Sequence, residues 1–287
     1  MSVGELAVNM AYQKGVRWLS AMHLVSTLVL VQVAVGCSRC PHSEAGASSE
    51  EWVRISAGRD FTCGLKGDCS VECWGDDPRE GKSIPPSGEF QDVSAAWGYT
   101  LGLRTDSSLA LWGPDDIADQ PIAEIPEGDF EAITADMNAC ALDGAGVLTC
   151  WGTDQFGDIA PPSGSFTTVS THGAHSCAVS EQGDVSCWGS NVCGQIDVPA
   201  EEYVSVSAGG CHTCAMTTAG EVSCWGSDDM GQASPPAGVF TQLDCGEEHT
   251  CGLLEDGTVT CWGSNEQQEY GTVNQSVAPA GIFVAVS

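Results

Sequence analysis

Lysine and arginine are scarce in this sequence. The 287 residues include 9 of them against 39 Asp and Glu, which gives a formal net charge of −30, and none lies beyond Arg104. Binding to nucleic acid depends on clustered Lys and Arg side chains that neutralise phosphates. The composition therefore excludes nucleic acid as an expected partner, and the acidic surplus predicts a soluble, self-repelling surface.

The sequence also lacks helical periodicity and the short motifs of familiar enzymes. Nowhere do apolar residues recur at the 3.6-residue period of an amphipathic helix. No glycine-rich phosphate loop, G-x-S-x-G motif or H-E-x-x-H motif occurs. Carboxylates are so frequent that no pair stands out as a general acid and base. We therefore expect no enzymatic activity and no cofactor.

One apolar run lies near the N-terminus, at residues 24–35, after Lys14 and Arg17 and directly before Gly36 and Cys37. A basic region, a short apolar core and small residues are the layout of an export signal, and the run is short for a membrane span. We expect residues 1–37 to be such a signal, with Cys37 lipidated as in bacterial lipoproteins. Cleavage without lipidation, which gives a secreted protein, is the alternative. Apart from this anchor at the outer membrane or cell surface, no membrane contact is expected.

The small, polar residues 38–51 predict a flexible tether, and a repeat begins at Trp52 and continues through residues 52–287. Trp-Gly pairs recur at spacings of 38, 39, 37, 37 and 37 residues. They begin at Trp74, Trp112, Trp151, Trp188, Trp225 and Trp262. Each unit opens with an aromatic residue, followed by three short segments of alternating polarity. Six units are complete, and the last five residues, FVAVS, match the opening strand of a seventh.

Such short strands cannot bury a face alone, so neighbouring units must stack. We predict an all-β fold, a β-propeller of six to seven small blades with about 37 residues per repeat. A straight β-solenoid is the alternative, although its coils are usually shorter and less hairpin-like. The terminal pentapeptide either closes the ring on the first unit or belongs to a longer chain. We expect a monomer.

Sixteen cysteines are too many to be incidental, and in an exported protein they predict disulfides. In five units two cysteines lie ten residues apart: Cys63 and Cys73, Cys140 and Cys150, Cys177 and Cys187, Cys214 and Cys224, and Cys251 and Cys261. A three-residue turn ending in a left-handed glycine, such as Gly257, places the two cysteines opposite each other in a hairpin. The second unit has Leu101 and Leu111 instead, so both cysteines are absent together.

The remaining cysteines allow several connectivities. Cys193, Cys211 and Cys245 lie in adjacent units and suggest a cross-blade bridge, whereas Cys40 and Cys69 have no evident partner. A metal site of His212, Cys214 and Cys224 is an alternative to a disulfide. Other units keep both cysteines without the histidine, which a ligand set does not allow. We therefore predict no metal site at these residues.

The consensus unit is F-x-x-V-S-A-G-x-x-H-T-C-A-x-x-x-x-G-x-V-x-C-W-G, and it resembles the repeat of the regulator of chromosome condensation family. The resemblance covers residues 52–287. The short period is similar to that of bacterial members such as β-lactamase inhibitor protein II. The resemblance implies a propeller of six or seven blades that binds other proteins through its loop-bearing face, and it implies no specific activity.

The loop between the first two strands differs from unit to unit, reading GRDF, AWGY, DMNA, HGAH, GGCH and GEEH. These loops should converge on one rim, where Trp, Tyr and Arg side chains commonly dominate binding energy. The predicted contact patch consists of Arg59, Trp97, Tyr99, Met137 and His172. We expect a protein or peptide ligand, with a calcium- or cation-binding surface protein or an inhibitor of a secreted hydrolase as alternatives.

Overall fold

The computed structural model describes residues 52–58, 61–75, 83–113, 116–117, 120–121, 125–152, 157, 159–264, 267–268 and 271–272. The predictions for the export signal, Cys37, the tether, Arg59 and the terminal pentapeptide fall outside these residues. The described part of the chain contains no helix with the length and apolar character needed to cross a membrane.

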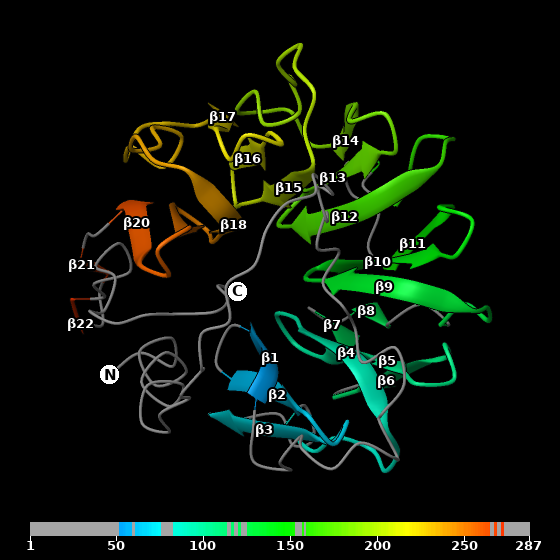
Figure 1. Cartoon of the computed structure of the whole chain (residues 1–287). Coiled ribbons are helices and arrows are strands. Elements are labelled where there is room, and N and C mark those ends of the chain that lie inside the picture. Colours follow the sequence, from blue (N-terminus) through cyan, green and yellow to red (C-terminus); the bar gives the residue numbers. More distant parts are fainter. Residues whose placement is uncertain are drawn as a thin grey trace, which may run out of the picture.

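Six three-stranded antiparallel sheets surround a common centre, so the predicted propeller is confirmed (Figure 1). Blades 1 to 3 consist of β1 (Trp52–Ala57), β2 (Phe61–Lys66) and β3 (Val71–Gly75); β4 (Phe90–Ala95), β5 (Thr100–Arg104) and β6 (Leu109–Trp112); and β9 (Phe130–Ala135), β10 (Asn138–Asp143) and β11 (Leu148–Gly152). Blades 4 to 6 consist of β12 (Phe166–His172), β13 (His175–Ser180) and β14 (Val185–Gly189); β15 (Ser205–Ala208), β16 (His212–Met216) and β17 (Val222–Gly226); and β18 (Phe240–Cys245), β19 (His249–Leu254) and β20 (Val259–Gly263).

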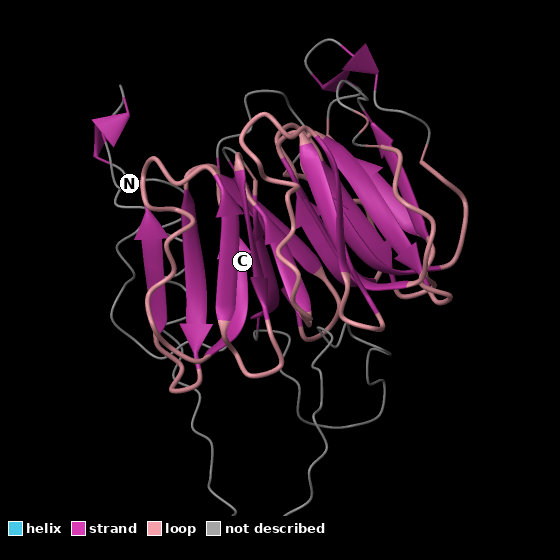
Figure 2. Cartoon of the chain, turned by 90° about the horizontal axis from the view of Figure 1, so that it is seen from above, coloured by secondary structure: helices cyan, strands magenta, loops and turns pink. Residues whose placement is uncertain are grey.

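In every blade the first strand lies innermost, the second in the middle and the third outermost. Two short hairpins project from the blades: β7 (Asp116–Ile117) with β8 (Gln120–Pro121), and β21 (Gln267–Gln268) with β22 (Gly271–Thr272). The strands run between two loop-bearing faces (Figure 2). The hairpin turns between second and third strands lie on one face, and the loops between first and second strands lie on the other. We call the face with the loops between first and second strands the loop face.

Each hairpin has the register that the turn chemistry predicts. In blade 6, Gly257 has a φ of 80° and its N–H bonds to the Leu254 carbonyl, which sets Cys251 opposite Cys261. All five cysteine pairs are disulfides, with Cα–Cα distances of 4.0 to 4.1 Å. In blade 2, Leu101 lies opposite Leu111 in the same register.

Neighbouring blades share apolar cores. Between blades 2 and 3, Leu101 and Leu103 of β5 pack against Phe130, Ile133 and Trp151 of the next blade. The junctions between blades 1 and 2, 3 and 4, 4 and 5, and 5 and 6 repeat this arrangement. One face of a blade thus carries the opening aromatic residue and the Trp of the Trp-Gly pair. The other carries the cysteine pair or its leucine equivalent, so the disulfides of blades 1, 3, 4 and 5 lie at the junctions with the following blade.

In blades 5 and 6 the tryptophan of the Trp-Gly pair also bonds to the loop that precedes its blade. Trp225 donates its indole N–H to the Gln195 carbonyl at 2.8 Å. The following Gly226 has a φ of 98°, and a Cβ there would lie 2.6 Å from the Cys211 carbonyl oxygen. Only glycine fits this close approach of two backbones. The glycine after the tryptophan has a positive φ in all six blades, which explains why glycine recurs at this position.

The inner strands are connected by a belt of side-chain hydroxyls. Ser56 accepts the Ala95 N–H of the next blade at 2.9 Å, and Ser207 accepts the Cys245 N–H at 2.9 Å. Ser94, Thr134 and Ser170 make the equivalent bonds at the three junctions between them. Because the hydroxyl satisfies a buried backbone donor, the V-S-A segment of each unit is a blade-joining element.

Candidate interaction face

The loop face is built from short connections, each closed by a backbone hydrogen bond across its base. Ala96 donates to the Tyr99 carbonyl, Gly209 to that of His212 and Gly246 to that of His249, at 2.8 to 2.9 Å. The residues inside these closures are the ones that differ between units. The packing faces of the blades are therefore repetitive, whereas the loop face is individual to each blade.

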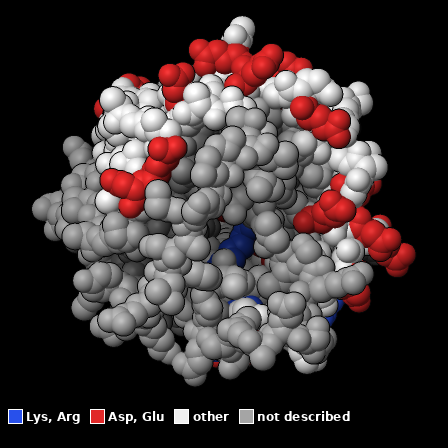
Figure 3. Space-filling view, viewed as in Figure 1, with Lys and Arg blue, Asp and Glu red and all other residues white. Residues whose placement is uncertain are grey.

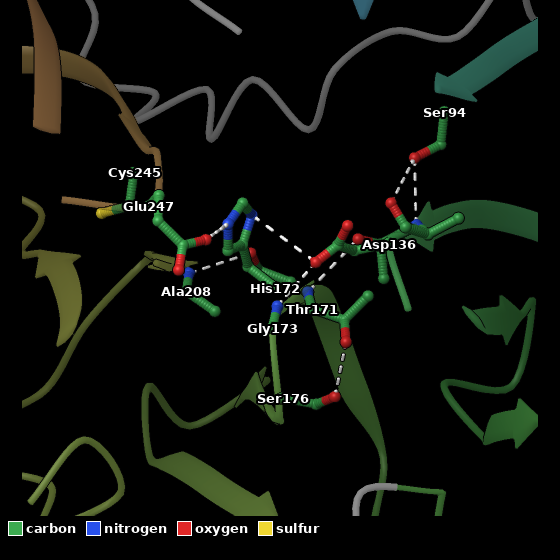
Figure 4. A network of polar contacts seen from close by, with 12 residues as sticks. Ser94, Asp136, Thr171, His172, Gly173, Ser176, Ala208, Cys245 and Glu247 are labelled. Carbon is green, nitrogen blue, oxygen red and sulfur yellow. Dashed lines mark hydrogen bonds and ion pairs between the residues drawn. The ribbon is translucent and has the colours of Figure 1, made fainter. Parts of the chain in front are cut away.

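His172 lies at the end of β12, between carboxylates from two other blades (Figure 4). Its Nε2 lies 3.4 Å from Oε2 of Glu247 in blade 6, and its Nδ1 lies 4.0 Å from Oδ2 of Asp136 in blade 3. Asp136 also accepts the Gly173 N–H at 2.6 Å, which joins the loops of blades 3 and 4. The side chains of His172 and Asp136 are 28% and 17% exposed, and that of Glu247 is 75% exposed.

The loop of blade 5 makes room for this contact because it carries two glycines. Gly210 donates its N–H to the Gly246 carbonyl at 3.2 Å, so the loops of blades 5 and 6 are in direct contact. A Cβ at Gly210 would lie 2.5 Å from the Glu247 carbonyl oxygen and 2.9 Å from its side-chain Cδ. Without side chains at this point, Glu247 reaches across blade 5 to His172.

The charges around His172 favour its protonated form. Partial burial opposes protonation, but the hydrogen bond with Glu247 and the charges of Asp136, Glu247 and Asp244 outweigh burial and raise the pKa of His172. The same hydrogen bond, assisted by the charge of His172, lowers the pKa of Glu247. Asp244, on the inner strand β18, has a raised pKa because it is removed from water.

The structure places the predicted contact residues differently from one another. Trp97 is 38% exposed in the loop of blade 2, and Met137 and His172 are half-buried on the same face. Tyr99 is 2% exposed and belongs to the core between blades 2 and 3. The prediction that Tyr99 belongs to the contact patch is wrong, because it occupies the inward position that Phe61 and His175 hold in their own blades. Asp136 and Glu247 were not predicted.

The repeated histidines are structural. His175 donates from Nε2 to the Thr213 hydroxyl at 2.8 Å, and Thr213 donates in turn to the Gln195 carbonyl at 2.8 Å. His212 and Thr250 form the same chain one blade later. Burial is the main reason that the pKa of His175 falls to about 3 and that of His212 to about 4. Both are therefore neutral links between blades.

The metal site considered as an alternative, made of His212, Cys214 and Cys224, has both of its cysteines joined in a disulfide. Among the described residues, one group of possible metal ligands lies close together: the donor atoms of His212, Cys214 and Cys245 are within 4.8 Å of one another. Cys214 is bonded to Cys224, and His212 Nε2 is bonded to Thr250. A disulfide sulfur offers no thiolate, and thiolate is the form in which cysteine binds metals.

The other cysteines resolve one connectivity that the sequence left open. Cys193, after β14, is bonded to Cys211 in the β15–β16 loop, with the Cα atoms 5.8 Å apart. Cys245 is a buried free thiol, and burial raises its pKa to about 12. Cys69 is also disulfide-bonded. The bridge that was suggested among three cysteines thus uses two of them, and it fixes the loop face between blades 4 and 5.

The acidic loops after the Trp-Gly pairs use their carboxylates internally. Asp228 accepts the Ala233 N–H at 2.9 Å and the Ser234 hydroxyl at 2.6 Å. Asn191 accepts the Ile196 N–H at 3.2 Å and donates to Asp197 at 2.9 Å. In both loops the side chain bonds a backbone N–H five residues further on, so it closes the loop in place of a backbone partner. In the view of Figure 3 the visible acidic side chains lie mainly toward the outer edge.

Fold and loop face together define a disulfide-rich β-propeller of three-stranded blades. Residues 172–195, 203–232 and 240–269 match the model of the Regulator of chromosome condensation (RCC1) repeat. These segments begin at the end of β12 and continue through blades 5 and 6, so the resemblance to this repeat family is confirmed. No curated protein sequence matches the chain.

Several solved structures share the fold. The ectodomain of the Physcomitrella patens receptor kinase CR4 is similar with a TM-score of 0.64 and 23% identity over 75% of this chain; the chain spans 64% of the length of that ectodomain. The CRINKLY WD40 ectodomain of the Arabidopsis thaliana receptor kinase ACR4 has a TM-score of 0.64 and 22% identity, covering 83% and 86% of the two chains. Prp20p from Saccharomyces cerevisiae has a TM-score of 0.64 and 13% identity, covering 74% and 72%. These likenesses concern the fold.

Proposed function

We propose that this protein is an exported interaction module that binds a protein or peptide ligand through its loop face. The observation that carries the proposal is the contrast between the two kinds of surface in each blade. The blade junctions repeat the same aromatic and hydroxyl contacts, whereas the residues inside the loops between first and second strands differ from blade to blade. On that face Trp97 leaves 38% of its surface exposed, and exposed tryptophan is a frequent anchor of protein interfaces.

Three further observations support the proposal. Yeast Prp20p has a similar fold, and its structure was reported with its binding properties to Gsp1p and histones. A second structure contains Prp20 bound to Kap60. The similar plant structures are receptor ectodomains. Six disulfides joining described residues suit an oxidising compartment. We therefore propose export through residues 1–37, with lipidation at Cys37 as the attachment to the cell surface.

The test compares capture of a partner by the wild-type protein and two variants. Immobilised protein is incubated with the surface fraction of the organism that makes it, and bound proteins are identified by mass spectrometry. Trp97→Ala removes the exposed anchor on the loop face. Val147→Ala is the matched control, because Val147 is 50% exposed but lies in the β10–β11 turn on the opposite face.

We expect wild type and Val147→Ala to retain the same partner equally. Trp97→Ala should bind that partner at least tenfold more weakly, which corresponds to about 1.4 kcal/mol of binding free energy. If Val147→Ala loses the partner while Trp97→Ala keeps it, the binding surface is the opposite face. If no protein is retained by the wild type at the cell surface, the proposal that this is an exported interaction module is wrong.

A further inference from the structure

The contact between His172 and Glu247 is unusual among the described inter-blade contacts because it passes over a whole blade. Hydroxyl, histidine and indole contacts each join a blade to its neighbour, whereas His172 of blade 4 meets Glu247 of blade 6, 75 residues later. The glycines of the blade 5 loop leave the space through which Glu247 reaches. Blade 3 contributes Asp136 on the other side of the imidazole.

We propose that His172 is a pH-operated clamp on the loop face. In its protonated form the imidazolium attracts both Asp136 and Glu247 and holds the loop of blade 6 over blade 5 against blade 4. In its neutral form the ring has one N–H, so it can donate to one carboxylate and not to both. The charge of the three side chains then changes from −1 to −2, and the two carboxylates repel each other. The clamp is a property of the chain by itself, and it goes beyond the proposed function.

The groups that face His172 all favour this behaviour. Asp136 comes from the β9–β10 loop, Glu247 from the β18–β19 loop and Asp244 from β18, and all three carboxylates attract a proton to the imidazole. The histidines that face it are His175 of β13, His212 of β16 and His249 of β19, and their pKa values are lowered mainly by burial. They remain neutral where His172 titrates, so they do not compete with it for the carboxylates.

The clamp is coupled to the backbone through the loop of blade 5. Gly210 donates its N–H to the Gly246 carbonyl, one residue before Glu247. Glu247 packs directly on Gly210, so movement of Glu247 away from His172 exposes this hydrogen bond to solvent. Local opening of such a bond is measured by the exchange of its amide hydrogen. The Gly210 amide is therefore a reporter for the clamp.

The first measurement follows the His172 imidazole by NMR during a pH titration of the intact protein. We expect His172 to titrate above the ordinary histidine value of about 6.5, and Glu247→Gln to lower its pKa, because the variant removes the charge of Glu247 and weakens its hydrogen bond. Glu248→Gln is the matched control, since it removes a carboxylate from the same loop and should leave the titration unchanged. Titration of His172 at or below the ordinary value, or equal shifts in both variants, would overturn the clamp.

The second measurement follows hydrogen exchange at the Gly210 amide on both sides of the His172 titration, expressed as a protection factor so that intrinsic exchange cancels. In wild type and Glu248→Gln we expect protection to be at least about threefold greater on the acid side. In Glu247→Gln and His172→Gln we expect no such step. Protection that is the same at both pH values in wild type, or a step that persists in His172→Gln, contradicts the proposal even if the pKa shifts as expected.

Discussion

The second and fourth blades place different side chains in the same positions of the same hairpin. Blade 4 has the Cys177–Cys187 disulfide, and blade 2 has Leu101 opposite Leu111. Cys177 and Leu101 are both fully buried and both pack against the aromatic face of the following blade. The position is therefore defined by the junction between blades, and the disulfide is one of two ways to fill it.

The largest effect should come from removing the disulfide that distinguishes these blades. Replacing Cys177 and Cys187 by Ala is expected to lower the free energy of unfolding by about 2–5 kcal/mol, because the unfolded chain gains freedom and a buried junction loses volume. Urea unfolding under non-reducing conditions measures the loss. A variant that unfolds within experimental error of wild type would show that the sulfur bond adds nothing to packing.

The reciprocal change provides the control for that experiment. Leu101→Cys with Leu111→Cys introduces the disulfide into blade 2 at the same register. If register alone determines bonding, the new pair oxidises and the protein loses the mass of two hydrogens. A pair that stays reduced under the conditions that oxidise blade 4 would mean that the two junctions differ in backbone spacing.

Much of the fold follows from the sequence because each unit repeats the same local chemistry. A left-handed residue in the turn, which is glycine in blades 3 to 6 and Cys69 or Ser107 in blades 1 and 2, fixes the hairpin. The hairpin fixes the cysteine register, and the Trp-Gly pair marks the end of the third strand. Tyr99 was misassigned although the repeat contained the information, since it occupies the same column as Phe61 and His175. The loop face was predicted only in outline. The contact of His172 with Glu247 depends on two units that meet through the curvature of the ring, and a linear repeat does not encode that distance.

A smaller effect should distinguish the buried histidine of blade 4 from the aromatic residues in its place in blades 1 and 2. The folded pKa of His175 lies at about 3, below the ordinary value for an unfolded chain, so the unfolded state binds the additional proton. Its contribution to stability is complete above about pH 6.5 and is lost as the pH falls toward the folded value. The free energy of unfolding of the wild type falls between about pH 7 and pH 5, and in His175→Phe this fall should be smaller by about 2 kcal/mol.

Urea unfolding of wild type and His175→Phe at both pH values tests this difference. Phe61 occupies the same position in blade 1 and is fully buried, so a Phe at position 175 has a precedent in the same chain. Part of the slope should remain, because the pKa values of His212 and His249 are also lowered. An identical slope in the two proteins would show that His175 is not desolvated as the structure indicates.

The smallest effect concerns the hydroxyl belt, which is present at junctions with and without a disulfide. Ser207→Ala removes the acceptor of the Cys245 N–H, and Ser94→Ala removes that of the Ala135 N–H. Each should cost about 0.5–1.5 kcal/mol in free energy of unfolding, as for one intramolecular hydrogen bond.

The blade before the junction of Ser207 carries the Cys214–Cys224 disulfide, and the blade before the junction of Ser94 carries the leucine pair. Equal losses in urea unfolding would show that belt and disulfide act independently. A distinctly larger loss for Ser94→Ala would show that the belt matters more where the covalent bond is missing, and a loss in neither would mean that water replaces the hydroxyl.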